Sequence, residues 1–213
     1  MGKTQRFSEK LRKYTKKMVV GLGIDKVSAV IVSWKRPNEV GQIVENLHQY
    51  DFIDEIIIAV NKPDDNKKCY RRWLAALGAK NSTIYTQDDD CIIGNIQELY
   101  DTYHKDRMVI GMKGNRIKDY FNAKSAMVGW GTFFEKDWID FTDYIEKYGE
   151  DDLLIRESDR IITYKIGCER PHNFQAIDIV DFPSAASDFA MYKQKEHWDT
   201  RDQAINRAQE LYA

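Results

Sequence analysis

Three consecutive aspartates, Asp88, Asp89 and Asp90, are the residues of this sequence whose types and spacing most clearly indicate chemistry. Like charges about 4 Å apart repel by roughly 4 kcal/mol at an effective dielectric constant near 20, so such a cluster either raises its pKa values or recruits a cation. If strand geometry continues through the triplet, Asp88 and Asp90 point to the same side and can face one hard cation. The sequence therefore predicts a Mn²⁺ or Mg²⁺ site at Asp88 and Asp90, with a solvated acidic turn as the alternative.

Two carboxylates would leave coordination positions of this ion open. A diphosphate fills such positions, and the ion then neutralises the charge that develops on a phosphate leaving group. The sequence contains neither GxxxxGK[ST] nor GxGxxG, so a P-loop NTPase or a Rossmann dehydrogenase would lack its phosphate-binding device. The metal and cations such as Arg36, Arg71 or Arg72 would have to hold the diphosphate instead. The predicted chemistry is that of nucleotide diphosphates.

Polar residues follow each of the first three strand-like runs of the sequence. β-branched runs occupy residues 27–33, 55–61 and 82–87, and their continuous apolar character is typical of buried parallel strands. In open parallel sheets, ligands bind beyond the carboxyl ends of the strands. We therefore expect the segment from Ser33 to Arg36, the side chain of Asn61 and the acidic triplet to share one edge of a sheet.

Helical periodicity alternates with these strands along the rest of the chain. Helices are predicted at about residues 37–50, 70–78, 96–103, 138–148, 153–164 and 199–213, the last opened by Asp199, and further strands at 108–112 and 126–134. The economical prediction is one α/β domain over residues 27–213, with a mostly parallel central sheet flanked by helices. Its last helix reaches the C-terminus without a stop signal, which fits the front module of a longer polypeptide.

The composition limits the class of protein. The chain has 213 residues, of which 43% are hydrophobic and 31% charged, and this suits one folded domain with a sizeable core. The formal net charge of −2 gives no indication of a nucleic-acid partner. The three cysteines show no metal-binding spacing and predict reduced thiols. With no apolar run near the roughly 20 residues of a membrane span, the expected location is cytoplasmic.

The first residues differ in charge from the rest of the chain. The first 17 residues hold seven cations and one anion, Glu9. Phe7, Leu11, Tyr14 and Met18 fall at helical spacing, which predicts a basic amphipathic helix within residues 1–26. Two interpretations stay open: peripheral contact with an anionic membrane surface, or a helix packed on the domain with its lysines solvated.

The order of these segments resembles a known family. The segments are Val30–Asn38, Phe52–Asn61 and Gln87–Ile93, with a looser likeness at Gly129–Phe134. Together they resemble the nucleotide-sugar-binding half of GT-A-fold glycosyltransferases, closest to the exostosin-like type, over about residues 27–167. In that family the acidic triplet is the DxD motif. The resemblance implies a GT-A fold, with Asp88 and Asp89 near the ribose or donor sugar and Asp90 on the metal.

The resemblance also implies a set of donor-binding residues. They are Ser33, Trp34, Arg36, Asn61, Arg72, Asp88, Asp89 and Trp130. Arg36 and Asn61 would touch the nucleoside, and Arg72 would lie near the diphosphate. One departure is that the family usually has an extra strand between the position of Asn61 and the helix before the triplet. The shorter spacing here leaves the roles of Arg71 and Arg72 open.

A transferase of this kind also needs a carboxylate that activates the acceptor hydroxyl or stabilises an oxocarbenium-like transition state. Asp159 stands shortly before the apolar Ile161 and Ile162, so we expect it on the partly buried cleft side of its helix. Asp152 belongs to the segment 150–152, which resembles the Glu-Asp motif of related inverting transferases. Each also has a non-catalytic interpretation, so both stay candidates. Asp152 could be a first-turn carboxylate that favours the helix dipole, and Asp159 could equally form a surface ion pair.

Two further side chains have open interpretations. His172 follows Pro171 in a late loop and is either an extra ligand for metal or phosphate or a surface residue. Trp130 stands between two glycines and either stacks on a sugar face or fills a core.

The resulting hypothesis is a metal-dependent glycosyltransferase that moves a hexose from a nucleotide diphosphate, UDP, to a hydroxyl of a glycan or similar acceptor. One alternative is a sugar-nucleotide nucleotidyltransferase. Such an enzyme requires a glycine-rich basic loop after the first strand, but residues 33–37, which follow that strand here, contain no glycine. The other is a non-catalytic carbohydrate- or partner-binding module with a structural cation.

Overall fold

The computed structural model describes residues 25–120, 123–188, 193 and 196–213. The amphipathic helix predicted within residues 1–26 rests on positions outside these ranges. In the described part of the chain, no helix combines the length and the apolar character that crossing a bilayer requires.

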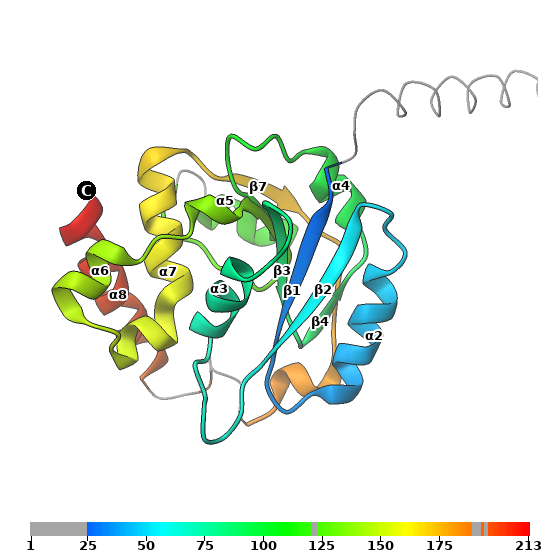
Figure 1. Ribbon diagram of the computed structural model, residues 1–213, viewed down its shortest axis with the longest axis horizontal. Coiled ribbons are helices and arrows are strands. Elements are labelled where there is room, and N and C mark those ends of the chain that lie inside the picture. Colours follow the sequence, from blue (N-terminus) through cyan, green and yellow to red (C-terminus); the bar gives the residue numbers. More distant parts are fainter. Residues whose placement is uncertain (1–24, 121–122, 189–192, 194–195) are drawn as a thin grey trace, which may run out of the picture.

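A six-stranded sheet forms the centre of the molecule (Figure 1). Its strands, in spatial order, are β2 (Ile53–Val60), β1 (Val27–Ser33), β3 (Thr83–Asp88), β6 (Thr132–Glu135), β5 (Val109–Met112) and β7 (Asn173–Ala176). Pairing is parallel between β2, β1 and β3 and between β5 and β7, whereas β6 runs antiparallel to both of its neighbours. The expected fold class, a mostly parallel α/β sheet flanked by helices, is confirmed.

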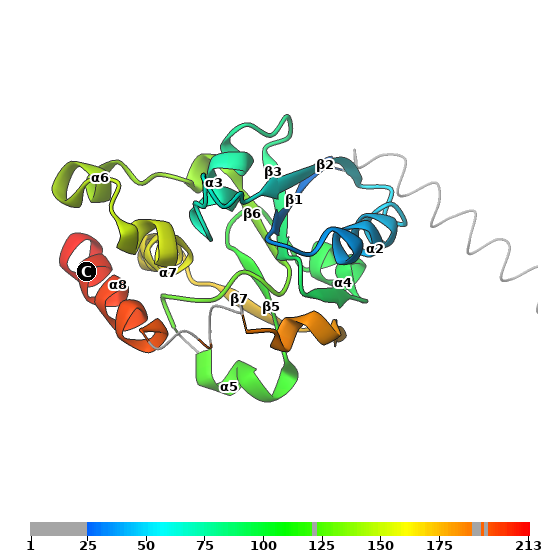
Figure 2. The ribbon, with the colours of Figure 1, turned by 90° about the horizontal axis from the view of Figure 1, so that it is seen from below.

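Helices cover both faces of this sheet. They are α2 (Pro37–Leu47), α3 (Tyr70–Leu77), α4 (Ile96–Asp101), α5 (Ile117–Tyr120), α6 (Thr142–Tyr148), α7 (Asp152–Glu169) and α8 (His197–Tyr212). Figure 2 shows α2 and α4 on one face and α3 and α7 on the other, with α8 packed outside α7. A second, two-stranded sheet pairs β4 (Cys91–Ile93) with β8 (Ile179–Asp181).

The apolar runs of the sequence become the core. The strand β1 is almost wholly buried because it lies between β2 and β3 and under helices on both faces. One buried cluster, which includes Trp73, Phe134 and Ile162, fills the face under α3 and α7. A second cluster, which includes Ile43 and Phe133, fills the face under α2 and α4.

The register of the parallel strands sets where the polar strand ends meet. Ser33 at the end of β1 pairs with Val60 at the end of β2, and Val32 pairs with Asp88 at the end of β3. The residues that follow these three strands therefore lie at one edge of the sheet, as predicted.

Several predicted boundaries were wrong. The strand expected at 126–134 begins only at Thr132, because the segment before it turns through Gly131, whose φ is +84°. The helix expected from 138 begins at Thr142, and the final helix begins at His197, so Asp199 lies in its first turn rather than at its N-cap. The helix expected at 153–164 extends over Asp152–Glu169 as α7.

Candidate functional site

A cleft of about 480 Å³ opens at the carboxyl ends of β1 and β3, between the sheet edge and α7–α8. Its charged lining comprises Arg36, Lys68, Arg72, Arg116, Arg156, Arg160 and Arg201, against Asp88, Asp89, Asp90, Glu157 and Asp159. Seven cations thus face five carboxylates. The excess of positive charge suits an anionic ligand such as a phosphate.

The acidic triplet forms a turn rather than an extended segment. Strand β3 ends at Asp88, residues 89–90 turn, and β4 begins at Cys91. The strand geometry expected through the triplet was therefore wrong, and the three carboxylates have three different surroundings.

Asp89 turns back towards the end of β1. Its Oδ2 accepts a hydrogen bond from the backbone N–H of Trp34 at 2.5 Å, and its Oδ1 pairs with Arg36 Nη1 at 2.5 Å. Both side chains of this ion pair are less than a tenth exposed. Burial raises the pKa of Asp89, while the bonds from Trp34 and Arg36 oppose the rise. The pair clamps the 33–36 loop onto the triplet.

Asp88 is joined to α7 through Arg72. The guanidinium of Arg72, only 1% exposed, lies 2.5 Å from Asp88 Oδ1 through Nη2 and 3.1 Å from Asp159 Oδ1 through Nε. Its Nη1 donates to Thr86 Oγ1 at 3.2 Å. Burial alone would lower the pKa of Arg72, but the carboxylates of Asp159 and Asp88 outweigh it and raise that pKa, so Arg72 stays a cation. One buried cation therefore connects the strand end to α7.

Asp159 is a buried carboxylate on the α7 side of the cleft. It accepts a hydrogen bond from Trp73 Nε1 at 2.9 Å in addition to its pairing with Arg72. Burial raises the pKa of Asp159 to about 6, with Arg72 acting in the opposite direction. A carboxylate with a pKa near this range is suited to accept a proton at neutral pH.

Asp90 is the triplet member with the least compensated charge. Burial raises its pKa to about 7, the neighbouring carboxylate of Asp88 adds to the rise, and Arg36 only partly opposes it. In the residues that the structure describes, no group of three or more His, Cys, Asp or Glu side chains could hold a metal ion by itself. The donor set of Asp88 and Asp90 fits an ion that takes one or two protein carboxylates and fills its other positions from phosphates, as Mg²⁺ does.

Asn61 and Gly129 shape the same edge. The side chain of Asn61 accepts from Lys67 N at 2.9 Å and donates to Lys68 O at 3.1 Å, which fixes the loop after β2. A Cβ placed on Gly129 would lie 2.0 Å from Asp88 Oδ2, so any larger residue there would have to displace this carboxylate. Both residues line the cleft.

Trp34 and Trp130 also line the cleft. The Lys113 ammonium lies 5.0 Å from the centroid of the Trp130 ring, which is half-buried. In the loop before Arg36, Lys35 adopts a left-handed backbone with φ 62°. Non-glycine residues in this conformation are concentrated at functional sites.

Four residues considered as site candidates do not line the cleft: Ser33, Arg71, Asp152 and His172. Ser33 is buried, and its carbonyl accepts from Asn61 N at 2.9 Å. Asp152 has a 72% exposed side chain that pairs with Arg156 Nε at 2.7 Å and Lys68 Nζ at 3.5 Å. The His172 Nε2 lies 2.7 Å from Lys124 O and 2.9 Å from Thr163 O, so His172 joins two backbone segments.

Apart from Asp159, sequence reasoning missed the side chains that α7 and α8 bring to the cleft. Glu157 lies at a kink in α7, with φ −122° and ψ 21°, and its Oε1 accepts from Thr200 Oγ1 of α8 at 2.9 Å. Burial raises the pKa of Glu157 to about 7, although the bond from Thr200 opposes the shift. From α8, Trp198 and Arg201 reach the cleft, with the Arg201 guanidinium 4.9 Å from the Trp198 ring centroid. Only the packing of α8 on α7 brings these side chains together.

No family model matches the sequence, and no curated protein is similar to it in sequence. Solved structures with a similar chain path include the 1–349 portion of S. aureus TarS in complex with UDP, at 10% identity and a TM-score of 0.49, covering 86% of this chain and 70% of that one. The same protein in complex with UDP-GlcNAc is 10% identical, with a TM-score of 0.46 and coverage of 86% and 71%. The inositol-1-phosphate CTP transferase from T. maritima is 8% identical, with a TM-score of 0.48 and coverage of 90% and 99%.

Proposed function

We propose that this protein is a metal-dependent glycosyltransferase of the GT-A type. It transfers the hexose of a UDP-hexose donor to a hydroxyl of a glycan or similar acceptor. The observation that carries the proposal is the arrangement around Arg72. This buried cation holds Asp88 at the strand end and Asp159 on α7 within one cleft, beside the poorly compensated Asp90. Carboxylates for a cation and a carboxylate for a proton thus face the same space.

The metal proposal rests on Asp90, with Asp88 beside it. Both present hard oxygen donors. Asp88 is paired with Arg72, whereas Asp90 faces the carboxylates of Asp88 and Asp89 with only Arg36 opposing them. A bound Mn²⁺ or Mg²⁺ would supply the positive charge that stabilises the diphosphate as it leaves the sugar. Arg36 and Arg72 keep the surrounding carboxylates fixed.

Asp159 is proposed as the general base. In the transfer, the bond between the anomeric carbon and the diphosphate oxygen breaks, and its electron pair leaves with the nucleotide. The acceptor oxygen forms the new bond to that carbon, and its proton passes to a carboxylate. Asp159 lines the cleft, and burial places its pKa at about 6. Asp152 is exposed and paired with Arg156, so the proposal assigns it no part in proton transfer.

The acceptor is proposed to enter along α7 and α8. Trp198, with 63% of its surface exposed, presents a flat apolar face of the kind that packs on sugar rings. On the opposite side of the cleft, Trp130 lies beside Gly129 and Asp88 and would pack against the donor sugar.

A panel of nucleotide sugars tests the proposal. Calorimetric binding and slow donor hydrolysis are measured for each compound with Mn²⁺ and with EDTA. We expect one UDP-sugar to bind and to release UDP only with the metal. Asp90→Asn should abolish this metal-dependent binding in a folded protein, because removing a buried charge does not strain the turn. Asp64→Asn, an exposed position in the loop after β2, is the matched control and should behave as wild type.

Other outcomes identify the alternatives. Release of diphosphate from a nucleoside triphosphate and a sugar phosphate would show a nucleotidyltransferase. Metal-dependent sugar binding with no turnover, together with loss of folding in Asp90→Ala, would show a carbohydrate-binding module with a structural cation. No metal-dependent preference for any nucleotide sugar would contradict the proposal outright.

A further inference from the structure

The strand β2 forms one end of the central sheet and has a neighbour, β1, on one side within the described residues (Figure 2). Natural edge strands are usually short or protected by lysine, proline or a bulge in mid-strand. β2 is eight residues long and contains no proline, lysine or arginine. Its register with β1 is irregular only at its beginning, next to Val27. In the part of the chain that the structure describes, the edge beyond Glu55 therefore lacks the usual protection against pairing with another strand.

The outward backbone groups of β2 can be assigned from its register. Asn61 N donates to Ser33 O at 2.9 Å, and pairing with β1 is regular from Glu55 to Val60. Since backbone groups alternate in direction along a strand, Ile56, Ile58 and Val60 direct their N–H and C=O groups away from β1. These residues form a row of donors and acceptors for a further strand.

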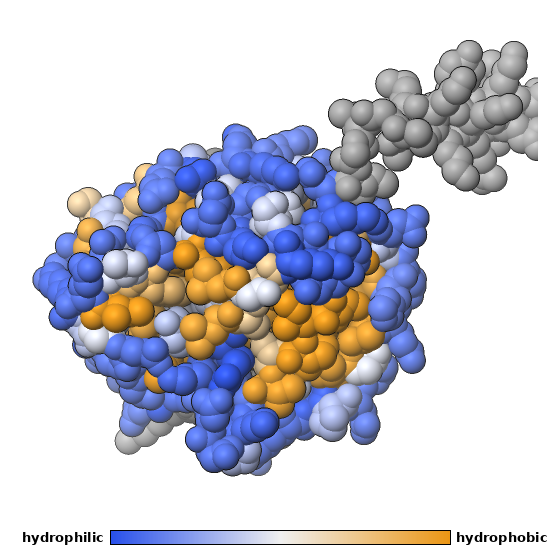
Figure 3. Space-filling model, in the orientation of Figure 1, coloured by the Kyte–Doolittle hydropathy of each residue, from blue (hydrophilic) through white to orange (hydrophobic). Residues whose placement is uncertain are grey.

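Apolar side chains flank this row. Val60 of β2 and Leu74 and Leu77 of α3 are 48%, 40% and 49% exposed, and the isoleucines at positions 56–58 are half-buried. Figure 3, which looks onto this edge, shows hydrophobic surface over β2, reaching towards α2 on one side and α3 on the other. Exposed apolar surface that is contiguous and bordered by polar residues marks an interaction site.

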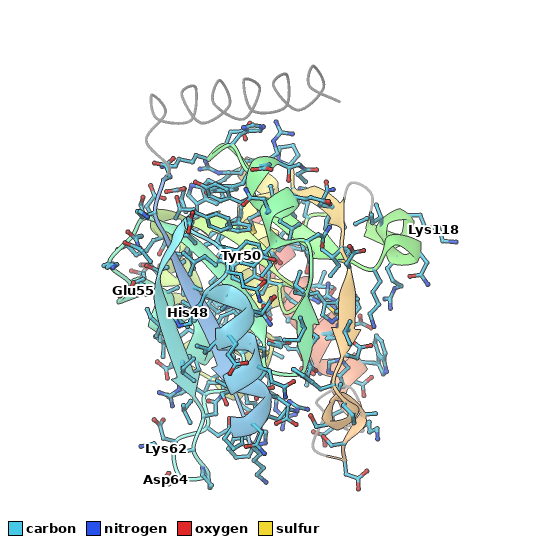
Figure 4. The ribbon with its side chains drawn as sticks, turned by 90° about the vertical axis from the view of Figure 1, so that its right-hand side faces the viewer. His48, Tyr50, Glu55, Lys62, Asp64 and Lys118 are labelled. Atoms are coloured by element: carbon cyan, nitrogen blue, oxygen red, sulfur yellow. The ribbon has the colours of Figure 1, made fainter. Side chains whose placement is uncertain are left out.

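The charges at the two ends of the strand indicate which partner fits. Acidic residues, Asp54 and Glu55, stand at the beginning of β2, and Lys62 follows its end. Figure 4 shows Glu55 and Lys62 at opposite ends of this edge. A second copy of β2 running antiparallel, centred on Ile58, would place Asp54 of each copy beside Lys62 of the other. Asp54 also pairs with Lys80 of its own chain at 3.2 Å, so Lys62 would be its second cation. The same register pairs the outward-directed Ile56 with Val60, apolar with apolar.

We propose that a second copy of this chain is the partner of β2, and that the two central sheets join through an antiparallel β2–β2 contact about a two-fold axis at Ile58. One surface then serves both copies, which is the condition for a closed two-fold dimer. Leu74 and Leu77 of each copy extend the contact from the sheet onto α3.

Sedimentation equilibrium of the full chain tests this proposal. We expect a reversible dimer. Val60→Lys should raise its dissociation constant at least about tenfold, because the dimer would bury two unpaired ammonium groups. Ile145→Lys is the matched control: Ile145 is 38% exposed but lies on α6, so its substitution should leave the dissociation constant unchanged. A wild-type chain that stays monomeric at all concentrations would overturn the proposal.

Two further measurements separate strand pairing from simple packing of apolar patches. Amide hydrogen exchange should slow with protein concentration at Ile56, Ile58 and Val60. Lys62→Asp should weaken the dimer, because it would place an aspartate beside Asp54 of the other copy. Protection of these amides that is independent of concentration would mean that this chain covers its own edge, and a dimer insensitive to Val60→Lys would place the interface elsewhere. Either result would refute the β2–β2 contact.

Discussion

Gly129 lies against the carboxylate of Asp88 so closely that a Cβ at Gly129 would come within 2.0 Å of Oδ2. The carbonyl of Gly129 also accepts from the backbone N–H of Asp88 at 2.9 Å. Gly129→Ala should therefore displace the Asp88 side chain while the fold persists, and reduce metal-dependent nucleotide-sugar binding at least about tenfold, or about 1.4 kcal/mol. Calorimetric titration measures this effect.

Gly41→Ala is the control for this prediction. No atom lies within 4 Å of a Cβ at Gly41, which is in α2, so alanine there should stabilise the fold by roughly 0.5–1 kcal/mol and leave donor binding unchanged. Unchanged binding in Gly129→Ala would show that the position of Asp88 does not matter to the ligand.

Arg72 and its neighbour Arg71 differ in burial and should differ in their effect on stability. Arg72→Ala leaves Asp88 and Asp159 without their shared cation. Losing one partner of a fully buried pair lowers the free energy of unfolding by about 3–5 kcal/mol, and the 41% exposure of Asp88 places the expected loss near the lower limit. Arg71→Ala removes a pairing with the half-exposed Asp65 and should change stability by less than about 1 kcal/mol. Urea unfolding of both variants checks this difference, and equal losses would contradict it.

The strand ends were predictable from sequence because they depend on local pattern and on one general rule. The apolar runs before Ser33, Asn61 and Asp88 each predict a buried strand, and parallel strands bring their carboxyl ends together. The observed register, with Val32 opposite Asp88 and Ser33 opposite Val60, realises this rule. The cleft therefore lies at the carboxyl ends of the strands, where the sequence pattern predicts a ligand site.

The partners of these residues were not predictable, because tertiary packing selects them. Whether Arg72 faces the sheet or solvent depends on how α3 lies between β3 and α7, and its partner Asp159 is far away in the chain. Asp89 was expected to share the direction of a strand, but the turn at residues 89–90 sends it to Arg36 instead. The kink of α7 at Glu157 could not be predicted either, because no glycine or proline stands at this position.

Glu157 should make the stability of the fold depend on pH. Burial raises the pKa of Glu157 in the folded state to about 7 from an ordinary value of 4.5. The folded state therefore holds its proton more tightly than the unfolded state does. The stability that this proton contributes is fully present below pH 4.5 and is lost as pH rises through about 7. The shift corresponds to at most roughly 3 kcal/mol.

Glu157→Gln removes this titration. Urea unfolding at pH 5 and pH 8 should show a larger decrease in stability for the wild type than for Glu157→Gln over this interval. The amide can still accept the hydrogen bond from Thr200, so the variant should fold. A decrease of equal size in both proteins would show that Glu157 does not titrate between these pH values.

Asp159 and Asp152, the two candidates for proton transfer, lie on the same helix, α7. Substituting each of them distinguishes the two. Asp159→Asn keeps the shape of the side chain and its place beside Trp73 but removes the group that accepts the proton. If Asp159 is the base, kcat for sugar transfer should fall by about 10²–10⁴-fold while the donor dissociation constant changes little. Asp152→Asn should leave both quantities near their wild-type values, because Asp152 is not part of the cleft lining, although its partner Arg156 is. A loss of kcat in Asp152→Asn, with full activity in Asp159→Asn, would reverse the assignment and leave Asp159 only the task of holding Arg72 in place.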